Sequence, residues 1–323
     1  MPDETGLMVA VARAYYEANE SKVEIAERIG ISRFKVARLL ESARETGIVQ
    51  IRIVEPTHPD DVLGERVAAH LNLRDCVVVP GAKDESTNRQ ALARAAATEI
   101  ASMAGRGDTI GFSWGRTVAE IGAHVGPLAD ARVVALTGAV GTDFALSPVD
   151  IFRSVSTHSG STTLSIFAPM FVDSPQTAKA LRQDPAIASV LAAYADLSLA
   201  VVSIGSWDPP VTQLMDALSD EEKQQLESGG ARAEMLGIFI DDRGRIVPCT
   251  AQSRCIAITA AQLLRTPRVL AVAGGSQKVP AMRAVACSGL ITSLVTDRRT
   301  AQMLLNGPAV GERTLNRAER IRG

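Results

Sequence analysis

Residues 21–53, SKVEIAERIGISRFKVARLLESARETGIVQIRI, contain two short helical patterns separated by a tight turn and followed by an apolar strand pattern. Ser21 is predicted to cap the first helix, because Glu24 stands three residues later, as in a capping box. Gly30 then ends that helix. Val49–Ile53 has the spacing of a strand at the place where a wing would follow the second helix. The stretch therefore predicts a helix-turn-helix of the winged type.

The second helix of this motif separates an apolar face from a polar one. Ser32 is placed to cap it, and Val36, Leu39, Leu40 and Ala43 recur at helical spacing. In helix-turn-helix proteins the N-terminal part of the second helix reads base edges, and flanking cations hold phosphates. The predicted DNA-binding residues are Ser32, Arg33, Lys35, Arg38 and Ser42. Arg33 and Lys35 are the best candidates for reading bases.

An ordinary helical hairpin would show the same apolar spacing, and the net charge of this segment does not favour DNA. Residues 1–54 contain eight lysines and arginines and eight aspartates and glutamates. Since phosphate neutralisation supplies most of the non-specific affinity, a single copy should bind DNA weakly. We therefore predict an oligomer that presents several copies to its operator.

The chain divides into a small head and a larger body. Its 323 residues suffice for two domains. Pro56 and Pro59 fall in a short polar stretch, Glu55–Asp60, which is typical of a linker. We predict a DNA-binding domain over residues 1–55 and a larger domain over residues 56–323.

The composition excludes several classes of protein. The net charge is −2 and 46% of the residues are hydrophobic, but no run approaches the roughly 20 apolar residues of a membrane span. The N-terminus, MPDETGLMVAVARAYYEANE, lacks the positive start and cleavage site of a signal peptide. The four cysteines are far apart without a C-x-x-C, so reduced thiols are favoured over disulfides or a zinc site. We predict a cytoplasmic protein without a membrane span, metal or other cofactor.

The body alternates short apolar runs with amphipathic helical patterns, which predicts an α/β fold with a mostly parallel sheet covered on both faces. The predicted strands are Cys76–Val79, Thr109–Phe112, Val133–Leu136, Thr163–Ile166, Leu197–Ile204, Ile238–Ile240, Val269–Val272 and Ser293–Val295. The predicted helices are Val62–Leu71, Gln90–Met103, Thr117–His124, Val149–Thr157, Thr177–Asp184, Asp184–Ala193, Val211–Ala217, Ala257–Leu264, Val279–Ser288 and Arg299–Leu305.

Three loops that follow predicted strands are rich in glycine and hydroxyl groups. They are Gly111–Thr117, Leu136–Gly141 and Ala273–Lys278, and the last of them ends in a lysine that could reach an anion. In a parallel sheet, ligands bind outside the carboxyl ends of the strands. Exposed amides and an arginine near a helix start are suited to a phosphate group. The loops therefore predict a site for a phosphorylated ligand.

The first of these loops also spells G-x-S-x-G, the nucleophile elbow of serine hydrolases. A hydrolase of that type needs an acid and then a histidine downstream of Ser113. The only later histidines are His124 and His158. Imine chemistry is also disfavoured, because Lys278 is the only lysine in a candidate loop and resembles a charge partner. Both reactions are therefore disfavoured.

The chain resembles the SorC family of bacterial transcriptional regulators, also called SorC/DeoR-type, over nearly its whole length. The resemblance rests on AERIGISRFKVARLLESARETGIVQIRI in the head. In the body it rests, in this order, on GDTIGFSWGRTV, ADLSLAVVSIGS, GARAEMLGIFIDDRGRIV, VLAVAGGSQKVPAMRA and LITSLVTDRRTAQMLL. It implies a Rossmann-like effector domain related in fold to sugar-phosphate isomerases and glucosamine-phosphate deaminases, used for sensing and assembled into dimers or tetramers.

The resemblance also implies a set of effector-binding residues. They are Ser113, Gly115, Arg116, Thr117, Thr137, Gly138, Glu234 and Lys278. Glu234 takes the place of an acidic residue that accepts hydroxyl hydrogen bonds, and Lys278 matches the lysine of the family's A-G-G-x-x-K. The chain departs from the family at Phe34, which replaces a frequent proline, and at LTGAVG. Thr137 stands where a charge is common, and a neutral hydroxyl favours a ligand with a single phosphate.

These observations predict a DNA-binding regulator of a carbohydrate catabolic operon. Its operator affinity would be controlled by a phosphorylated sugar or polyol bound in residues 56–323, the effector and oligomerisation domain. The alternative is an enzyme of the sugar-phosphate isomerase or deaminase type that carries a DNA-binding head. The sequence favours the regulator, because Glu234 has no histidine or second carboxylate in its own motif and general acid–base catalysis needs a positioned partner.

Overall fold

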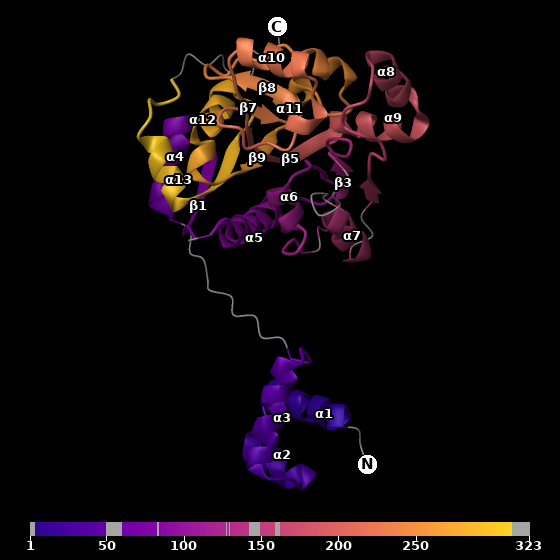
Figure 1. Ribbon diagram of the computed structural model, residues 1–323, viewed down its shortest axis with the longest axis vertical. Coiled ribbons are helices and arrows are strands. Elements are labelled where there is room, and N and C mark those ends of the chain that lie inside the picture. Colours follow the sequence, from indigo (N-terminus) through magenta and orange to yellow (C-terminus); the bar gives the residue numbers. More distant parts are fainter. Residues whose placement is uncertain are drawn as a thin grey trace. The chain divides into compact units, whose positions relative to one another are not determined.

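The chain forms two compact units, Met1–Pro56 and Thr57–Gly323, here called the smaller and the larger unit (Figure 1). The structure is a computed structural model. It describes residues 4–49, 60–82, 84–126, 128, 130–141, 149–158 and 162–311, with only the backbone for residues 154–158. The predicted wing beyond Val49 and the predicted linker before Asp60 lie outside the described residues.

The smaller unit packs three helices around an apolar core. They are α1 (Glu4–Tyr16), α2 (Lys22–Ile29) and α3 (Arg33–Glu45). Val11, Ile25 and Val36, one from each helix, are fully buried together. The sequence patterns did not predict α1, but it supplies about a third of this core. Both predicted helices of the helix-turn-helix are confirmed.

Local signals in the sequence set the turn between α2 and α3. The Ser21 hydroxyl accepts a hydrogen bond from the Glu24 amide at 3.3 Å, and the Ser21 amide donates to the Glu24 carboxylate at 2.8 Å. Gly30 ends α2 with φ 75°, a left-handed conformation that favours glycine. The Ser32 hydroxyl then accepts from the Lys35 amide at 3.2 Å and starts α3. The capping residues therefore determine where α3 begins.

A parallel sheet of seven strands forms the centre of the larger unit, in the order β1-β10-β9-β5-β2-β3-β4. Its strands are β1 (Asp75–Val79), β2 (Thr109–Phe112), β3 (Arg132–Ala135), β4 (Thr162–Leu164), β5 (Leu197–Ser203), β9 (Arg268–Val272) and β10 (Ser293–Asp297). Each strand was predicted from an apolar run, because strands that are buried on both faces have nearly continuous hydrophobic sequences.

Helices cover both faces of this sheet (Figure 1). On one face lie α5 (Glu85–Met103), α6 (Arg116–Ile121) and α7 (Val149–His158). On the other lie α4 (Asp61–Leu71), α12 (Val279–Ser288) and α13 (Arg298–Leu305). At the end of the sheet and beside the small sheet lie α8 (Pro175–Gln183), α9 (Pro185–Ala192), α10 (Asp220–Ser228) and α11 (Ala260–Arg265).

The order of the strands explains why helices cover both faces. The chain runs outward through β2, β3 and β4, and in the opposite direction through β5, β9 and β10. Right-handed crossovers that start in opposite directions place their helices on opposite faces.

A small antiparallel sheet, β6 (Gly205–Ser206), β7 (Ala231–Met235) and β8 (Ile238–Asp241), stands outside the main sheet. The strand predicted at Ile238–Ile240 therefore belongs to this sheet and not to the parallel one. The helix predicted at Val211–Ala217 is wrong apart from a 3₁₀ turn, η3, at Met215–Ala217. An antiparallel bridge between Ser206 and Val211 holds that segment extended. Three further 3₁₀ turns are η2 (Ala193–Asp196), η4 (Thr250–Arg254) and η5 (Ser276–Lys278).

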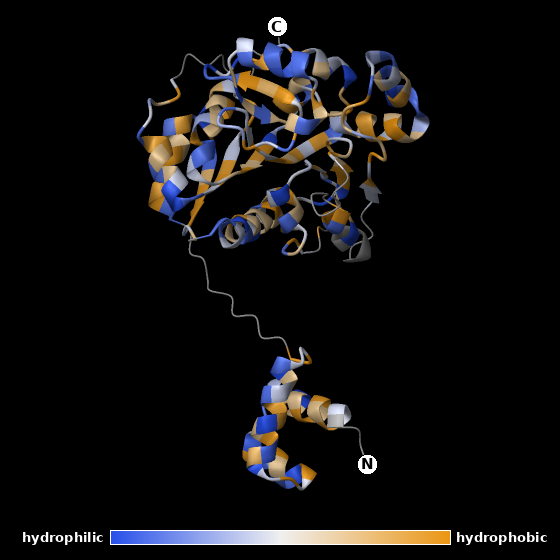
Figure 2. Ribbon diagram, viewed as in Figure 1, coloured by the Kyte–Doolittle hydropathy of each residue, from blue (hydrophilic) through white to orange (hydrophobic). Residues whose placement is uncertain are grey.

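Apolar side chains of the strands and of the inner helix faces form one continuous core in the larger unit. Figure 2 shows hydrophobic residues along the strands of the large sheet, whereas the helices mix hydrophobic with hydrophilic residues. Phe112, Ile100 and Leu199, from β2, α5 and β5, are fully buried. The core therefore fixes the strand ends from which the loops of the larger unit emerge.

A buried ion pair joins α10 to η4 in the larger unit. The Arg254 Nε donates to the Glu222 carboxylate at 2.8 Å, and these side chains are only 17% and 7% exposed. The same guanidinium donates to the carbonyls of Val172 and Ala217, each at 3.0 Å. This hydrogen bonding by Arg254 holds the pKa of Glu222 below its ordinary value.

Replacing Glu222 with glutamine should lower the free energy of unfolding by about 2 kcal/mol at pH 7, because a buried guanidinium loses its counter-charge but keeps hydrogen bonds. A carboxylate with a depressed pKa stabilises above its unfolded pKa, and that stability is lost as pH falls through the folded pKa. Urea unfolding of both proteins should therefore show a difference at pH 7 that shrinks below pH 4.5, the ordinary value. A difference that stays constant with pH would contradict this role.

Candidate functional site

A cavity of about 280 Å³ opens at the carboxyl ends of β2, β5 and β9. These three strands are neighbours in the sheet. The chain adds successive strands on one side from β2 onward and on the other side from β5 onward, so the strand order reverses between β2 and β5. Such a reversal leaves a crevice between adjacent loops, which is where open α/β sheets bind ligands. The volume is near the lower end of small-molecule sites, so the cavity suits a ligand of sugar size.

The loop after β2 supplies Gly115, Arg116 and Thr117 to the cavity wall. Gly115 has φ 138°, and a Cβ there would stand 2.7 Å from the Ser203 hydroxyl, so only glycine fits without strain. Ser113, also predicted for the site, is not among the lining residues. It is 2% exposed, and its hydroxyl accepts a hydrogen bond from the Ser203 amide at 3.1 Å. Ser113 therefore joins the loop to β5 and holds the wall in place.

Thr137 and Gly138 do not line this cavity. Their loop follows β3, one strand further from the reversal point than β2. Thr137 is bridged to Ala257, and the Gly138 amide donates to the Ile256 carbonyl at 2.8 Å. The loop is thus paired with the segment before α11 and lies away from the cavity.

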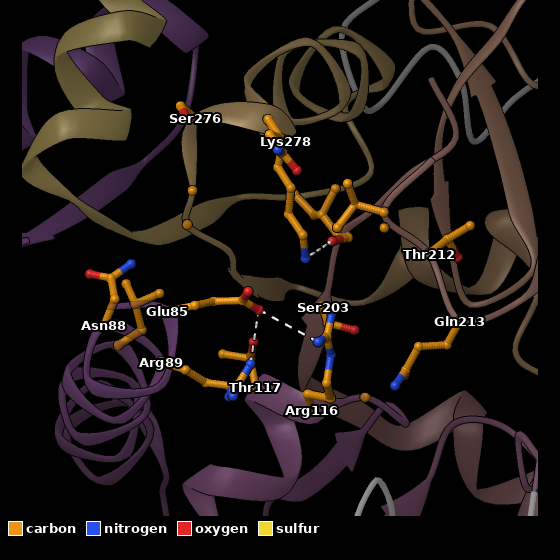
Figure 3. A pocket seen from close by; sticks show the side chains of 18 of the residues that line it. Glu85, Asn88, Arg89, Arg116, Thr117, Ser203, Thr212, Gln213, Ser276 and Lys278 are labelled. Carbon is orange, nitrogen blue, oxygen red and sulfur yellow. Dashed lines mark hydrogen bonds and ion pairs between the residues drawn. The ribbon is translucent and has the colours of Figure 1, made fainter. Parts of the chain in front are cut away.

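The loop after β9, Gly274–Lys278, lines the cavity on the side opposite the α6 loop (Figure 3). Asp297, at the end of β10, accepts hydrogen bonds from the amide of Gly275 at 3.0 Å and from Asn88 of α5 at 3.2 Å. Burial works to raise the pKa of Asp297, but hydrogen bonds from Thr300, Asn88 and Gly275 hold it below its ordinary value. The buried Asp297 carboxylate therefore holds both the loop after β9 and Asn88 of α5 in place at the cavity.

Lys278 and Glu234 form the inner, half-buried part of the cavity. The Lys278 ammonium donates to the Ile204 carbonyl at 2.9 Å, and the Glu234 carboxylate accepts from the Thr212 hydroxyl at 2.8 Å. Burial raises the pKa of Glu234 and lowers the pKa of Lys278, while the charge of each opposes the shift of the other. Gly205 makes room for Glu234, since a Cβ there would stand 2.1 Å from its carboxylate oxygen.

A second charged group lies at the outer side of the cavity, where one carboxylate stands between two arginines. Glu85 pairs with Arg89 at 3.1 Å and with Arg116 at 3.5 Å (Figure 3). The Glu85 side chain is 75% exposed, so each pair contributes little to stability. The two arginines are thus positioned to hold an anion and meet a protein carboxylate in this structure.

Several cavity residues were not predicted from the sequence. Glu85, Asn88 and Arg89 come from the first turns of α5, Ser203 is the last residue of β5, and Thr212 follows β6. The start of α5 could have been included among the candidate sites, because it follows β1 and the carboxyl end of β1 lies at the same edge of the sheet. Ser203 was missed because the predicted strand Leu197–Ile204 included it, whereas β5 ends at this residue.

The DNA-binding residues predicted in α3 differ in their surroundings. Arg33, Lys35 and Arg38 are exposed, whereas Ser42 is half-buried. The Ser32 hydroxyl is used as the cap of α3. Val36 and Leu40 on the other side of the helix are buried against α1 and α2. The three cations therefore lie on the open side of α3, towards its N-terminal half.

Among the described residues, no cluster of three or more histidine, cysteine, aspartate or glutamate side chains could hold a metal ion. In the same part of the chain no helix has the length and apolar character of a membrane span. The described cysteines, Cys76, Cys249, Cys255 and Cys287, are free thiols.

The family model described as "Putative sugar-binding domain" matches residues 56–306. The chain is 27% identical over 315 residues to the deoxyribonucleoside regulator of Bacillus subtilis, covering 93% of this chain and 97% of that one. It is 28% identical over 307 residues to the erythritol catabolism regulatory protein EryD of Brucella abortus, with 94% and 97% covered.

The fold is also found in a crystal structure of the full-length sorbitol operon regulator SorC from Klebsiella pneumoniae. The TM-score is 0.67 at 24% identity, and the similarity covers 93% of this chain and 98% of that one. The parallel α/β unit is therefore Rossmann-like, and the structural neighbours include SorC-type regulators. With the family match over most of its length, the chain belongs to the SorC family, the SorC/DeoR-type bacterial transcriptional regulators with a sugar-binding domain.

Proposed function

We propose that this regulator binds operator DNA through α3 and that a phosphorylated sugar or polyol in the cavity of the larger unit controls its operator affinity. The observation that carries the proposal is the sorting of charge within one cavity. The outer part offers the guanidinium groups of Arg89 and Arg116, and the half-buried inner part offers a carboxylate and an ammonium group, Glu234 and Lys278. A phosphorylated polyol has one anionic end and one end rich in hydroxyls.

The chemistry of the two ends supports one orientation of the ligand. Arginines bind phosphate through paired N–H donors, so the phosphate is expected between Arg89 and Arg116. Glu234 accepts hydroxyl hydrogen bonds, and Lys278 can donate to a hydroxyl or to the phosphate. The names of relatives refer to a sorbitol operon, to erythritol catabolism and to deoxyribonucleosides, which supports a ligand of sugar or polyol character.

The proposed regulation is a difference in affinity between two arrangements of an oligomer. Four subunits would present two pairs of α3 helices to operator half-sites, and the ligand would favour one arrangement. Only such a difference can shift the equilibrium, and a coupling of about 1–3 kcal/mol changes operator affinity roughly 5- to 150-fold.

Thermal unfolding of the purified full-length protein, measured against a panel of phosphorylated and unphosphorylated sugars and polyols, tests this proposal. A phosphorylated compound should raise the melting temperature, and it should also change the affinity for a DNA sequence selected by the protein. Stabilisation by unphosphorylated compounds alone would refute the phosphate site. Ligand binding without any change in DNA affinity would refute the regulation.

One observation favours the enzymatic alternative. Glu234 and Lys278 lie close enough to influence each other's pKa, and burial shifts both pKa values towards neutrality. Such a pair could move protons in an isomerase or deaminase. Incubation of the protein with the same sugar phosphates, followed by chromatographic analysis, would detect turnover, whereas a sensor leaves the compounds unchanged.

Replacing Glu85 with glutamine should tighten binding of the phosphorylated ligand about three- to tenfold. The Glu85 carboxylate competes with the ligand for Arg89 and Arg116, and the loss of an exposed ion pair removes roughly 1 kcal/mol of that competition. Calorimetric titration measures the change. Glu99→Gln, at the other end of α5, is the control and should bind as the wild type does. Equal affinities for Glu85→Gln and the wild type would place the ligand's anion elsewhere.

A further inference from the structure

Phe34 is exposed to an unusual degree on the smaller unit. It leaves 78% of its surface open, more than any other large hydrophobic residue described in that unit. It is the second residue of α3. Since successive helix residues are about 100° apart, Phe34 and Arg38 share one side, opposite the buried Val36 and Leu40. The ring therefore lies at the centre of the open side of α3.

The charges around this ring identify the kind of partner that would cover it. The Arg33 guanidinium stands 5.5 Å from the ring centroid, and Lys35 and Arg38 are its other charged neighbours in the first turns of α3. The acidic residues of the open side, Glu41 and Glu45, come only in the C-terminal half. A second copy that met this face ring to ring would bring the cations of both copies together. A polyanion, in contrast, would neutralise the three cations and bury the ring.

The major groove of DNA offers one apolar group at its base edges, the C5-methyl of thymine. Resting on the DNA-binding function proposed above, we propose that Phe34 packs against a thymine methyl and sets a preference for thymine at one position of each half-site. Arg33 positions the ring by stacking against it, and the N-terminal place of Phe34 in α3 is the part of a recognition helix that reaches bases.

The test uses the full-length protein and a double-stranded DNA library, from which its preferred sequence is selected. Each thymine of that sequence is then replaced in turn by deoxyuracil, which lacks only the methyl group. Replacing the thymine at one position of a half-site should weaken binding about fourfold, which is the effect of leaving one methyl group unburied. Replacing the matching thymines of both half-sites should weaken binding about fifteenfold. In Phe34→Ala, affinity should fall while replacement at that position has no further effect.

The matched control is Phe167→Ala, because Phe167 is a 95% exposed phenylalanine in the larger unit. That variant should keep both the affinity and the methyl effect. A methyl effect that is equal in wild type and Phe34→Ala, or absent from both, overturns the inference while leaving DNA binding intact. Equal loss of affinity for selected and random DNA in Phe34→Ala also overturns it. If no sequence is selected at all, the proposed DNA-binding function itself fails, and this inference with it.

Discussion

Replacing Lys278 with alanine should abolish the thermal stabilisation that a phosphorylated sugar or polyol gives to the wild type. The Lys278 ammonium lies in the inner part of the cavity, where its hydrogen bond to the Ile204 carbonyl fixes its position. A hydrogen bond from a charged group contributes about 1.5–3 kcal/mol, so ligand affinity should fall roughly 10- to 100-fold. At a ligand concentration only a few times the wild-type Kd, the melting temperature of the variant should then barely respond.

Two controls keep this result interpretable. Lys179→Ala removes an exposed lysine on α8 and should leave the ligand response unchanged. Binding of Lys278→Ala to the selected DNA, measured without ligand, reports whether the protein is still folded and assembled. A ligand response equal to that of the wild type would remove Lys278 from the binding site.

Replacing Arg38 with alanine should have the opposite pattern, with operator binding lost and the ligand response retained. Arg38 is exposed on the open side of α3, and it belongs to the smaller unit while the cavity belongs to the larger one. A good bidentate contact to a base is worth about 1–3 kcal/mol. Because an operator engages at least two copies of α3, the losses multiply, and we expect affinity to fall at least about 30-fold.

The dependence of binding on salt distinguishes the two ways in which Arg38 could act. If Arg38 holds a phosphate, the slope of log affinity against log salt should fall by about one for each copy, for selected and random DNA alike. If it reads a base, the slope stays and the preference for the selected sequence falls. Arg13→Ala, which removes an exposed cation on α1, is the charge control. Loss of the ligand response in Arg38→Ala would contradict two separate roles.

Much of the fold follows from local sequence signals. The Ser21–Glu24 capping box and Gly30 predicted the helix-turn-helix, since a cap and a left-handed glycine act within a few residues. Strands such as β2 and β9 were predicted because a strand covered on both faces needs a continuous apolar run. In contrast, β7 includes Arg232 and Glu234, which face solvent or the cavity, and so it lacks such a run.

The cavity could be predicted only in part, because strand order is not a local property. The loops after β2 and β9 meet across β5, whereas the loop with Thr137 follows a strand on the far side of β2. From sequence alone these three loops are equivalent. Glu85 and Arg89 were missed because their pairing partner, Arg116, is distant in sequence, and their chemistry emerges only when α5 and α6 lie side by side.

The pairing of β1 with β10 also has a consequence for how the chain folds during synthesis. Asp75 of β1 and its partner Ser293 of β10 are 218 residues apart, and β10 is the one neighbour of β1 in the described sheet. On the ribosome, β1 emerges long before its partner, and a contact of such separation forms slowly because a long loop must close. Until then the edge of β1 is unpaired and open to other chains. A chain that ends before residue 293 would therefore have an incomplete sheet with an open edge at β1, and we expect it to aggregate more readily than the full-length chain.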